Sequence, residues 1–378
     1  MSRDLLFWLE GQSDSMMALL RRLVELESPS TDKASVDRLG KVLTEELSAS
    51  GAQVTLLSSD RYGDHIRAVV GTPSKDGQLL VLGHLDTVWE LGTLQAMPFR
   101  VADGLAHGPG TFDMKAGLVQ LVFALRALRE SGRSSQGITV LINSDEEIGS
   151  PSSRADIEEE ARRSRAALVL EPSLPPRGSV KTFRKGVGIF ELKVKGRPAH
   201  AGLDPEKGIS AIEEIARQVQ FLHKLTDRDK GITVSVGTIR GGSRVNVVAA
   251  EAHAEIDLRV STAADAEEIE KKILGLRPFL KGAEVRVTGG IDRPPLERSP
   301  GVVALYEKAR VIAADLGFEL GEGSAGGSSD GNLTAAQGVP TLDGLGPMGD
   351  GAHADSEHIV VSDLPRRAAL LARLLETV

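Results

Sequence analysis

Apolar residues follow two different spacings along the first part of the chain. Leucines recur at helical spacing in residues 17–26 and 116–130. Short apolar runs that predict strands occupy residues 53–57, 65–70, 79–82, 138–142 and 167–170. The run 79–82 is apolar at every position, which is typical of a central strand buried on both faces. This alternation predicts an α/β catalytic domain in which a mixed sheet is covered by helices on both faces.

The pattern changes after residue 178. The spacing then predicts a strand at 187–194, a helix at 209–222, strands at 232–239 and 250–260, a helix at 264–276 and a strand at 283–287. This β-α-β-β-α-β order is that of a ferredoxin-like unit. We therefore predict an inserted domain at residues 179–290. It would divide the catalytic domain into a first half at 1–178 and a second half at 291–378.

Composition narrows the classes of partner and metal site. A chain of 378 residues favours two domains over a single core. Its 45 Lys and Arg against 53 Asp and Glu give a net charge of -8, which argues against a nucleic-acid partner. Because the chain has no cysteine, a metal site must use nitrogen and oxygen ligands. The sequence shows neither a signal-peptide pattern nor an apolar segment of membrane length, so we expect a cytoplasmic protein without a membrane partner.

Histidines and carboxylates follow directly on several of the predicted strands. They are His84, Asp86, Glu146, Glu147 and Glu171. Because ligands of an open α/β sheet bind at the carboxyl ends of its strands, these side chains are expected to converge on one edge. Asp113 follows a glycine-rich turn, and His353 lies in a loop of small residues. Two histidines and several carboxylates suit a pair of divalent cations, so the pattern indicates a two-metal hydrolase.

Each of these residues also has an ordinary structural interpretation. Asp113 suits a helix N-cap, and a single loop histidine is usually solvated. Glu146 and Glu147 suit an exposed acidic loop. However, adjacent side chains point in different directions, so one glutamate can bind metal while the other acts as general base. Their joint occurrence favours the metal site over the separate structural explanations.

The chain resembles the zinc-dependent family of acetylornithine deacetylase, succinyl-diaminopimelate desuccinylase and bacterial glutamate carboxypeptidase. The matching stretches occur in the family's order at residues 83–88, 108–117, 145–150, 171–173 and 353–357. The ferredoxin-like insertion also falls in the family's place. Trp89 and the stretch 344–347 favour the glutamate carboxypeptidase branch.

The resemblance implies a role for each acidic or histidine residue at the strand ends. His84 and Glu171 would bind one zinc ion, Glu147 and His353 a second, and Asp113 would bridge the two. Cobalt or manganese are alternative occupants of such a site. The peptide bond between Asp113 and the next residue is expected to be cis.

The resemblance also implies the catalytic groups. Glu146 would be the general base, and Asp86 would be the partner that orients the His84 imidazole. His200, on the inserted domain, would donate a hydrogen bond to the developing oxyanion. In dimeric relatives this histidine reaches the active site of the partner subunit, so a homodimer formed through the inserted domain is expected.

Substrate recognition is implied at two places. Arg259 and Asn246 match positions that hold the carboxylate of the substrate, and a guanidinium suits a free carboxylate. Gly327 and Ser328 belong to a glycine-rich loop that would face the substrate. A side-chain carboxylate would need a further cation, and the candidates are Lys181, Arg184, Lys185 and Arg293.

These roles predict hydrolysis of the amide bond of an N-acyl amino acid or dipeptide with a free carboxylate, with release of a C-terminal glutamate. Deacylation of an N-acetyl or N-succinyl amino acid, such as acetylornithine or succinyl-diaminopimelate, is an alternative that uses the same metal chemistry. A non-catalytic binding protein is disfavoured, because a binder has no need of Glu146. A nucleotide-binding oxidoreductase is disfavoured because the first half has no Gly-x-Gly-x-x-Gly turn.

Overall fold

The computed structural model describes residues 2–72, 77–133 and 137–378, and the chain divides into two compact units. The first unit comprises Met1–Phe183, Arg298–Ala325 and Ser329–Val378. The second comprises Arg184–Glu297 together with Gly326–Ser328. Each unit has a hydrophobic core of its own.

The first unit is built on a six-stranded mixed sheet with the order β1-β2-β6-β3-β7-β14. Its strands are β1 (Gln53–Leu57), β2 (His65–Val70), β3 (Gln78–His84), β6 (Ile138–Asn143), β7 (Ser164–Val169) and β14 (Thr341–Leu342). The pairs β6-β3, β3-β7 and β7-β14 are parallel. Strands β1 and β2 are antiparallel to their neighbours. The carboxyl ends of β3, β6 and β7 therefore lie at the same edge.

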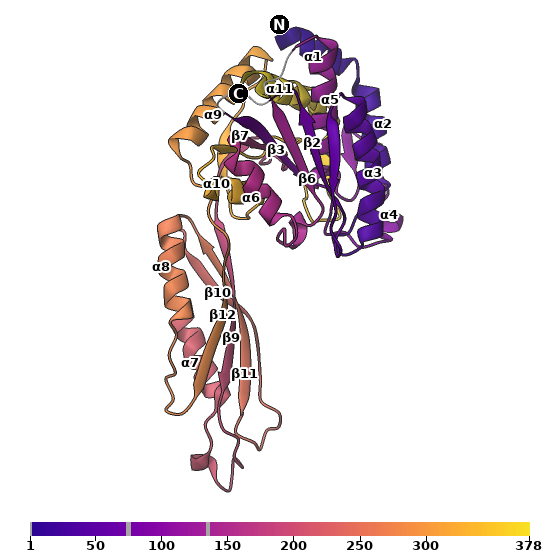
Figure 1. Ribbon diagram of the computed structural model, residues 1–378. Coiled ribbons are helices and arrows are strands. Elements are labelled where there is room, and N and C mark those ends of the chain that lie inside the picture. The colour runs from indigo at the N-terminus through magenta and orange to yellow at the C-terminus, as the bar shows by residue number, and fades with distance from the viewer. Residues whose placement is uncertain (1, 73–76, 134–136) are drawn as a thin grey trace. The chain divides into compact units, whose positions relative to one another are not determined.

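Helices cover both faces of this sheet, as the α/β pattern predicts (Figure 1). One face packs against α1 (Ser2–Glu10), α2 (Ser13–Val24), α3 (Lys33–Ala49), α5 (Ala116–Glu130), α9 (Pro300–Asp315) and α11 (Leu364–Thr377). The other packs against α6 (Arg154–Arg162) and α10 (Asp330–Ala336). In β3, Leu79 and Val81 join the first core, whereas Leu80 and Leu82 join the second. The prediction of a strand buried on both faces is confirmed.

The structure adds elements that the hydrophobic pattern does not indicate. The leucine spacing covers α2 only, and a separate helix, α1, precedes it. A small sheet with the order β15-β16-β5-β4 joins Gly349–Asp350, His358–Val360, Leu105–His107 and Arg100–Ala102. Strands of two or three residues are too short to show an alternation. This sheet nevertheless brings the chain before Asp113 next to the chain that follows His353.

The second unit is a four-stranded antiparallel sheet with α7 (Ala211–His223) and α8 (Ala263–Leu274) along one side (Figure 1). Its strands are β9 (Gly186–Lys195), β10 (Thr233–Gly241), β11 (Glu251–Val260) and β12 (Glu284–Arg293). The sheet order is β10-β11-β9-β12, which is that of a ferredoxin-like fold. Strand β12 is longer than the predicted segment 283–287, because Gly289 and Gly290 break the apolar alternation but still pair with β9.

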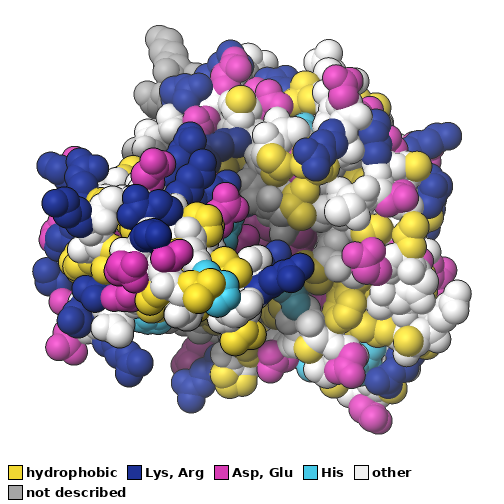
Figure 2. Space-filling view, turned by 90° about the horizontal axis from the view of Figure 1, so that it is seen from below, with side chains coloured by type: hydrophobic (Ala, Val, Ile, Leu, Met, Phe, Trp, Pro, Cys, Tyr) yellow, Lys and Arg dark blue, Asp and Glu magenta, His cyan; other side chains and the backbone are white. Residues whose placement is uncertain are grey.

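The described chain also contains one short helix and a two-stranded sheet. Helix α4 spans Thr93–Ala96, and strands β8 (Val180–Arg184) and β13 (Glu322–Ala325) form a two-stranded sheet. Within the described ranges, no helix is both long and apolar enough to cross a bilayer. On the face drawn in Figure 2, acidic and basic side chains are interspersed with apolar ones.

Helix α5 offers a test of the first core. Leu121 is fully buried, and Leu121→Ala is expected to lower the free energy of unfolding of the first unit by about 2–5 kcal/mol, because a cavity replaces the side chain. The two tryptophans of the chain, Trp8 and Trp89, both belong to this unit, so their fluorescence during urea unfolding reports on it alone. Val311→Ala, at a position 55% exposed on α9, is the control, with an expected change within about 0.5 kcal/mol. Equal unfolding midpoints for the two variants would contradict the buried place of α5.

Candidate metal centre

His84 is the last residue of β3 and is almost completely buried. Its Nε2 atom lies 3.2 Å from Oδ1 of Asp113 and 3.5 Å from Oε1 of Glu171. Its Nδ1 atom lies 2.9 Å from the main-chain carbonyl oxygen of Asp86, which can only accept a hydrogen bond. With the ring proton on Nδ1, the imidazole directs the Nε2 lone pair towards the carboxylates, as a metal ligand must.

Asp113 lies between two imidazoles. Its Oδ1 atom faces His84, and its Oδ2 atom lies 3.5 Å from Nε2 of His353. The same Nε2 atom of His353 lies 3.2 Å from Oε2 of Glu147. A carboxylate with a histidine nitrogen at each oxygen is placed to bridge two cations. The Asp113-Met114 peptide bond is cis, as the family resemblance implies.

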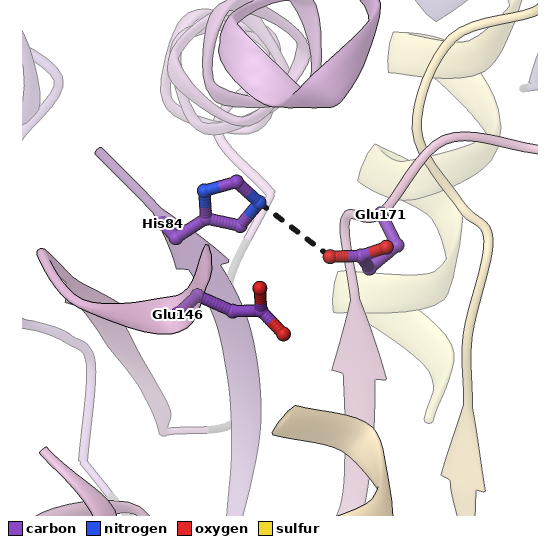
Figure 3. A group of neighbouring side chains, drawn as sticks. All are labelled: His84, Glu146 and Glu171. Carbon is purple, nitrogen blue, oxygen red and sulfur yellow. Dashed lines mark ion pairs between the residues drawn. The ribbon is translucent and has the colours of Figure 1, made fainter. Parts of the chain in front are cut away.

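The possible ligand atoms form two overlapping groups. His84, Asp113 and Glu147 each offer an atom within 4.8 Å of the others, and so do His84, Glu146 and Glu171. Figure 3 shows the second group, in which the imidazole and the two carboxylates point towards a common space. Glu146 therefore lies close enough to the ligand atoms to act on a water molecule held among them.

Asp86 organises the loop that carries the two adjacent glutamates. Its carboxylate is fully buried and accepts the main-chain N–H groups of Glu146 at 3.2 Å and Glu147 at 3.1 Å. It also accepts the hydroxyl of Ser30 at 2.7 Å. The nearest carboxylate oxygen is 3.6 Å from Nδ1 of His84, so the imidazole is held by the main-chain carbonyl of Asp86 instead. The side chain thus fixes the acidic loop, and the main chain fixes the histidine.

Burial and close charges shift the pKa values of the cluster. Burial raises the pKa of Glu147 to about 7, although the hydrogen bond with His353 opposes this shift. Hydrogen bonds with Asp113 and Glu147 raise the pKa of His353 to about 10. Burial opposes protonation of His84, but hydrogen bonds with Asp113 and Glu171 raise its pKa well above the usual value. The carboxylates thus need positive charge beside them, which either protonated imidazoles or metal cations can supply.

The donor set fits divalent metal ions. Among the described residues, Oε1 of Glu147 is buried and has no hydrogen-bond partner. A buried carboxylate oxygen without a donor is costly, and coordination to a cation would remove that cost. The remaining donors are imidazole nitrogens and carboxylate oxygens, a set that suits zinc and also cobalt or manganese.

His200 and Asn246 lie next to each other in the second unit. His200 forms an antiparallel bridge with Val247, the residue after Asn246. The Nδ1 atom of His200 accepts the main-chain N–H groups of Gly202 and Leu203, both at 3.1 Å. Because Nδ1 is the acceptor, the proton of the neutral ring resides on Nε2. The exposed imidazole therefore presents an N–H donor, which is the form that an oxyanion requires.

The other predicted substrate contacts already have partners. Nε and Nη2 of Arg259 contact the carboxylate of Asp257 at 2.8–3.1 Å. The carbonyl oxygens of Gly327 and Ser328 accept hydrogen bonds from Nη1 of Arg184 at 3.2 and 3.1 Å. Arg184, one of the cations considered for a substrate side chain, therefore supports the glycine-rich loop.

Ser30 and Glu357 contact the cluster but are not singled out by the sequence. Ser30 donates to Asp86, and Glu357 accepts main-chain N–H groups of the loop that carries Asp113. Glu357 lies inside the matching stretch 353–357, yet its partners are more than 240 positions away in the chain. Gly110, in that loop, has φ 70, and a Cβ atom there would lie 2.6 Å from Cγ2 of Thr87. The loop therefore requires glycine at this point.

The sequence is similar to known proteins over most of the chain. Residues 80–377 match the family described as "Peptidase family M20/M25/M40". Carboxypeptidase G2 of Pseudomonas sp. (strain RS-16) is 31% identical over 372 residues, which cover 96% of this chain and 89% of the relative. Succinyl-diaminopimelate desuccinylase of Dechloromonas aromatica is 28% identical over 399 residues, with 96% and 98% covered. Acetylornithine deacetylase of Myxococcus xanthus is 26% identical over 325 residues, with 80% of each covered.

Solved structures share the fold. The aminopeptidase PepT of Bacillus cereus superposes with a TM-score of 0.75 at 22% identity, covering 96% of this chain and 98% of that one. The M20 family metallo-carboxypeptidase Sso-CP2 of Sulfolobus solfataricus gives a TM-score of 0.72 at 17% identity, with 96% and 98% covered. These likenesses confirm the predicted architecture of a catalytic α/β domain with an inserted domain. With the family match and the 31% identical relative, they lead to one conclusion: the chain belongs to peptidase family M20/M25/M40, as a hydrolase of its metallopeptidase and amidohydrolase group.

Proposed function

We propose that this protein is a two-zinc hydrolase that cleaves the amide bond of an N-acyl amino acid or dipeptide with a free carboxylate. The observation that carries the proposal is the arrangement around Asp113. Its two oxygens face the Nε2 atoms of His84 and His353 at 3.2 and 3.5 Å. Glu171 lies beside the first histidine and Glu147 beside the second.

In this proposal His84 and Glu171 would hold one cation, His353 and Glu147 would hold the other, and Asp113 would contribute to both sites. When bound, the cations would polarise the scissile carbonyl and lower the pKa of a water molecule. The protein contributes the fixed positions of the ligands. The segments that carry Glu147 and Asp113 donate main-chain hydrogen bonds to the side chains of Asp86 and Glu357, which are not proposed as ligands.

Glu146 is the proposed general base. Its carboxylate lies among the ligand atoms of His84 and Glu171, and its main-chain N–H group is held by Asp86. It would take a proton from the attacking water and pass it to the leaving nitrogen. Both transfers require the carboxylate to stay beside the ligand atoms, and the hydrogen bond from the main-chain N–H of Glu146 to Asp86 fixes the backbone that carries it.

His200 is the proposed oxyanion donor. Its Nδ1 atom is occupied by two main-chain N–H groups, so Nε2–H is the group that it offers. The family resemblance supports a position of this histidine at the active site of a partner subunit, and a homodimer formed through the inserted domain is part of the same proposal. The second unit would receive the substrate carboxylate. The proposed contacts are Asn246, which lies next to His200 in the fold, Arg259, and the loop that contains Gly327 and Ser328.

Release of a C-terminal glutamate is the proposed specificity. Similarity over 96% of the chain to a protein named carboxypeptidase supports release of a C-terminal residue. Lys181 is the proposed cation for the side-chain carboxylate, because its buried Nζ atom lies 3.8 Å from Oε2 of Glu171. Lys185, by contrast, donates to the carbonyl of Gly231 at 2.6 Å. Deacylation of an N-succinyl or N-acetyl amino acid is the second candidate, favoured by the similarity to the desuccinylase.

Metal removal tests the proposed function directly. The purified protein is expected to bind two equivalents of zinc, to lose activity on chelation and to regain it with zinc. Release of glutamate from N-acyl, N-benzoyl and folate-like conjugates would support the proposed specificity. Activity confined to N-acetyl or N-succinyl amino acids would favour the second candidate instead. A protein that neither binds metal nor hydrolyses any of these amides would refute both.

The two adjacent glutamates are expected to have different phenotypes. Glu146→Gln should lower kcat by about 10²–10⁴-fold with both zinc equivalents retained, because the general base is lost. Glu147→Gln should lose one zinc equivalent, because its carboxylate is a ligand. Glu90→Gln, an exposed acid nearby, is the control and should change neither property. Metal analysis and steady-state kinetics distinguish the three, and loss of zinc from Glu146→Gln would contradict its role as base.

Replacing His200 tests the oxyanion role. His200→Ala is expected to lower kcat by about 10²–10³-fold with little change in KM and both metals in place, because a donor to the transition state is lost. His223→Ala removes another exposed histidine of the same unit and serves as control. Steady-state kinetics at constant zinc provide the measurement. Wild-type kcat for His200→Ala would exclude it from the reaction.

A further inference from the structure

Glu357 is a fully buried carboxylate that accepts four hydrogen bonds. Its Oε1 atom accepts the main-chain N–H groups of Phe112 at 2.8 Å and Asp113 at 3.0 Å. Its Oε2 atom accepts the main-chain N–H of Gly110 at 2.9 Å and the indole Nε1–H of Trp89 at 2.8 Å. Each carboxylate oxygen thus serves two donors.

These bonds join three segments that each carry a proposed metal ligand. Trp89 follows His84, the loop 110–113 contains Asp113, and Glu357 itself lies four residues after His353. Strands β5 and β16, which lead into and out of the last two segments, pair antiparallel. One side chain therefore links the ligand segments of both proposed cations.

The loop before α5 depends on this acceptor for its hydrogen bonding. Buried main-chain N–H groups are almost always paired, because an unpaired one is costly. In residues 110–113, the N–H of Thr111 pairs with the carbonyl of Gly108 inside the loop. The other three N–H groups of this segment point to Glu357. Burial raises the pKa of Glu357, and the N–H groups of Asp113 and Gly110 oppose that shift, so the loop in turn stabilises the carboxylate.

We propose that Glu357 is a positioning residue for metal binding: it sets the loop 110–113 so that Asp113 faces both histidines. The inference rests on the proposed two-metal function. Glu357 acts through Asp113, because its partners are main-chain groups and Trp89 and not the ligand atoms. Residues that hydrogen-bond to metal ligands and orient them contribute about 10–100-fold to metal affinity in other sites.

The substitution Glu357→Gln keeps the size of the side chain but not its hydrogen bonding. A carboxylate can accept at both oxygens, whereas a carboxamide has one oxygen and an NH₂ group that only donates. Two of the four N–H donors would then face another donor. The loop is expected to shift and to carry Asp113 away from at least one histidine.

Zinc titration against a competing chelator provides the test. The wild type is expected to take up two equivalents, and Glu357→Gln is expected to bind at least one of them about 10–100-fold more weakly. Asp355→Asn, an exposed acid in the same loop, is the matched control and should bind as the wild type does. Excess zinc should restore the kcat of Glu357→Gln with KM unchanged, which a general loss of stability would not produce.

Wild-type affinity for both equivalents in folded Glu357→Gln overturns this inference while leaving the two-metal function intact. Failure of the wild type to bind two equivalents would instead refute the proposed function on which the inference rests. Should Glu357→Gln not fold, Trp89→Phe removes one of the four donors without touching the main chain. Severalfold weaker zinc binding is expected for that variant, and unchanged binding overturns the inference as well.

Discussion

Repulsion between carboxylates in a largely buried space is the constraint on which the first unit depends. Asp113, Glu147 and Glu171 meet around His84, and burial, together with the charge of Asp113, raises the pKa of Glu147 to about 7. Buried carboxylates this close together destabilise the fold unless positive charge lies among them and each side chain is held in place. The parallel strands β3, β6 and β7 bring the acids together, because their carboxyl ends share one edge. The same edge is where open α/β sheets bind their ligands.

Two further buried acids hold the segments that carry these carboxylates. Asp86 accepts the main-chain N–H groups of Glu146 and Glu147, and Glu357 accepts those of the loop that carries Asp113. In both cases a buried carboxylate pairs with the backbone of the segment that holds another carboxylate. Irregular segments have main-chain donors that no strand or helix partner satisfies, so an acid at that point both completes their hydrogen bonding and fixes their course. Asp86 and Glu357 are fully buried, whereas the side chain of the proposed ligand His353 is 51% exposed.

The sequence predicts what depends on local periodicity. Strand β3 and the ferredoxin-like order of the second unit follow from apolar spacing, and His84 and Glu171 stand out because they follow apolar runs directly. The four short strands around His107 and His358 give no such signal, since two or three residues show no period. Long-range contacts are equally hidden: nothing local in Glu357 indicates partners at Trp89 and Gly110. The sequence predicts Asp86 as the partner that orients the His84 imidazole. In the structure its main-chain carbonyl makes that contact, whereas its carboxylate accepts main-chain N–H groups of the acidic loop.

The proposed ligands and the proposed substrate-binding groups belong to different units, and this separation has a physical consequence. In the proposed function, metal affinity would depend on contacts inside the first unit, where Asp86 and Glu357 accept main-chain hydrogen bonds from the ligand segments. The proposed oxyanion donor, His200, has its Nδ1 atom occupied by main-chain donors of the second unit. Neither set of hydrogen bonds includes a residue of the other unit. In the proposed function, substitutions around His200 would therefore lower turnover without disturbing the hydrogen bonds that hold the ligand segments.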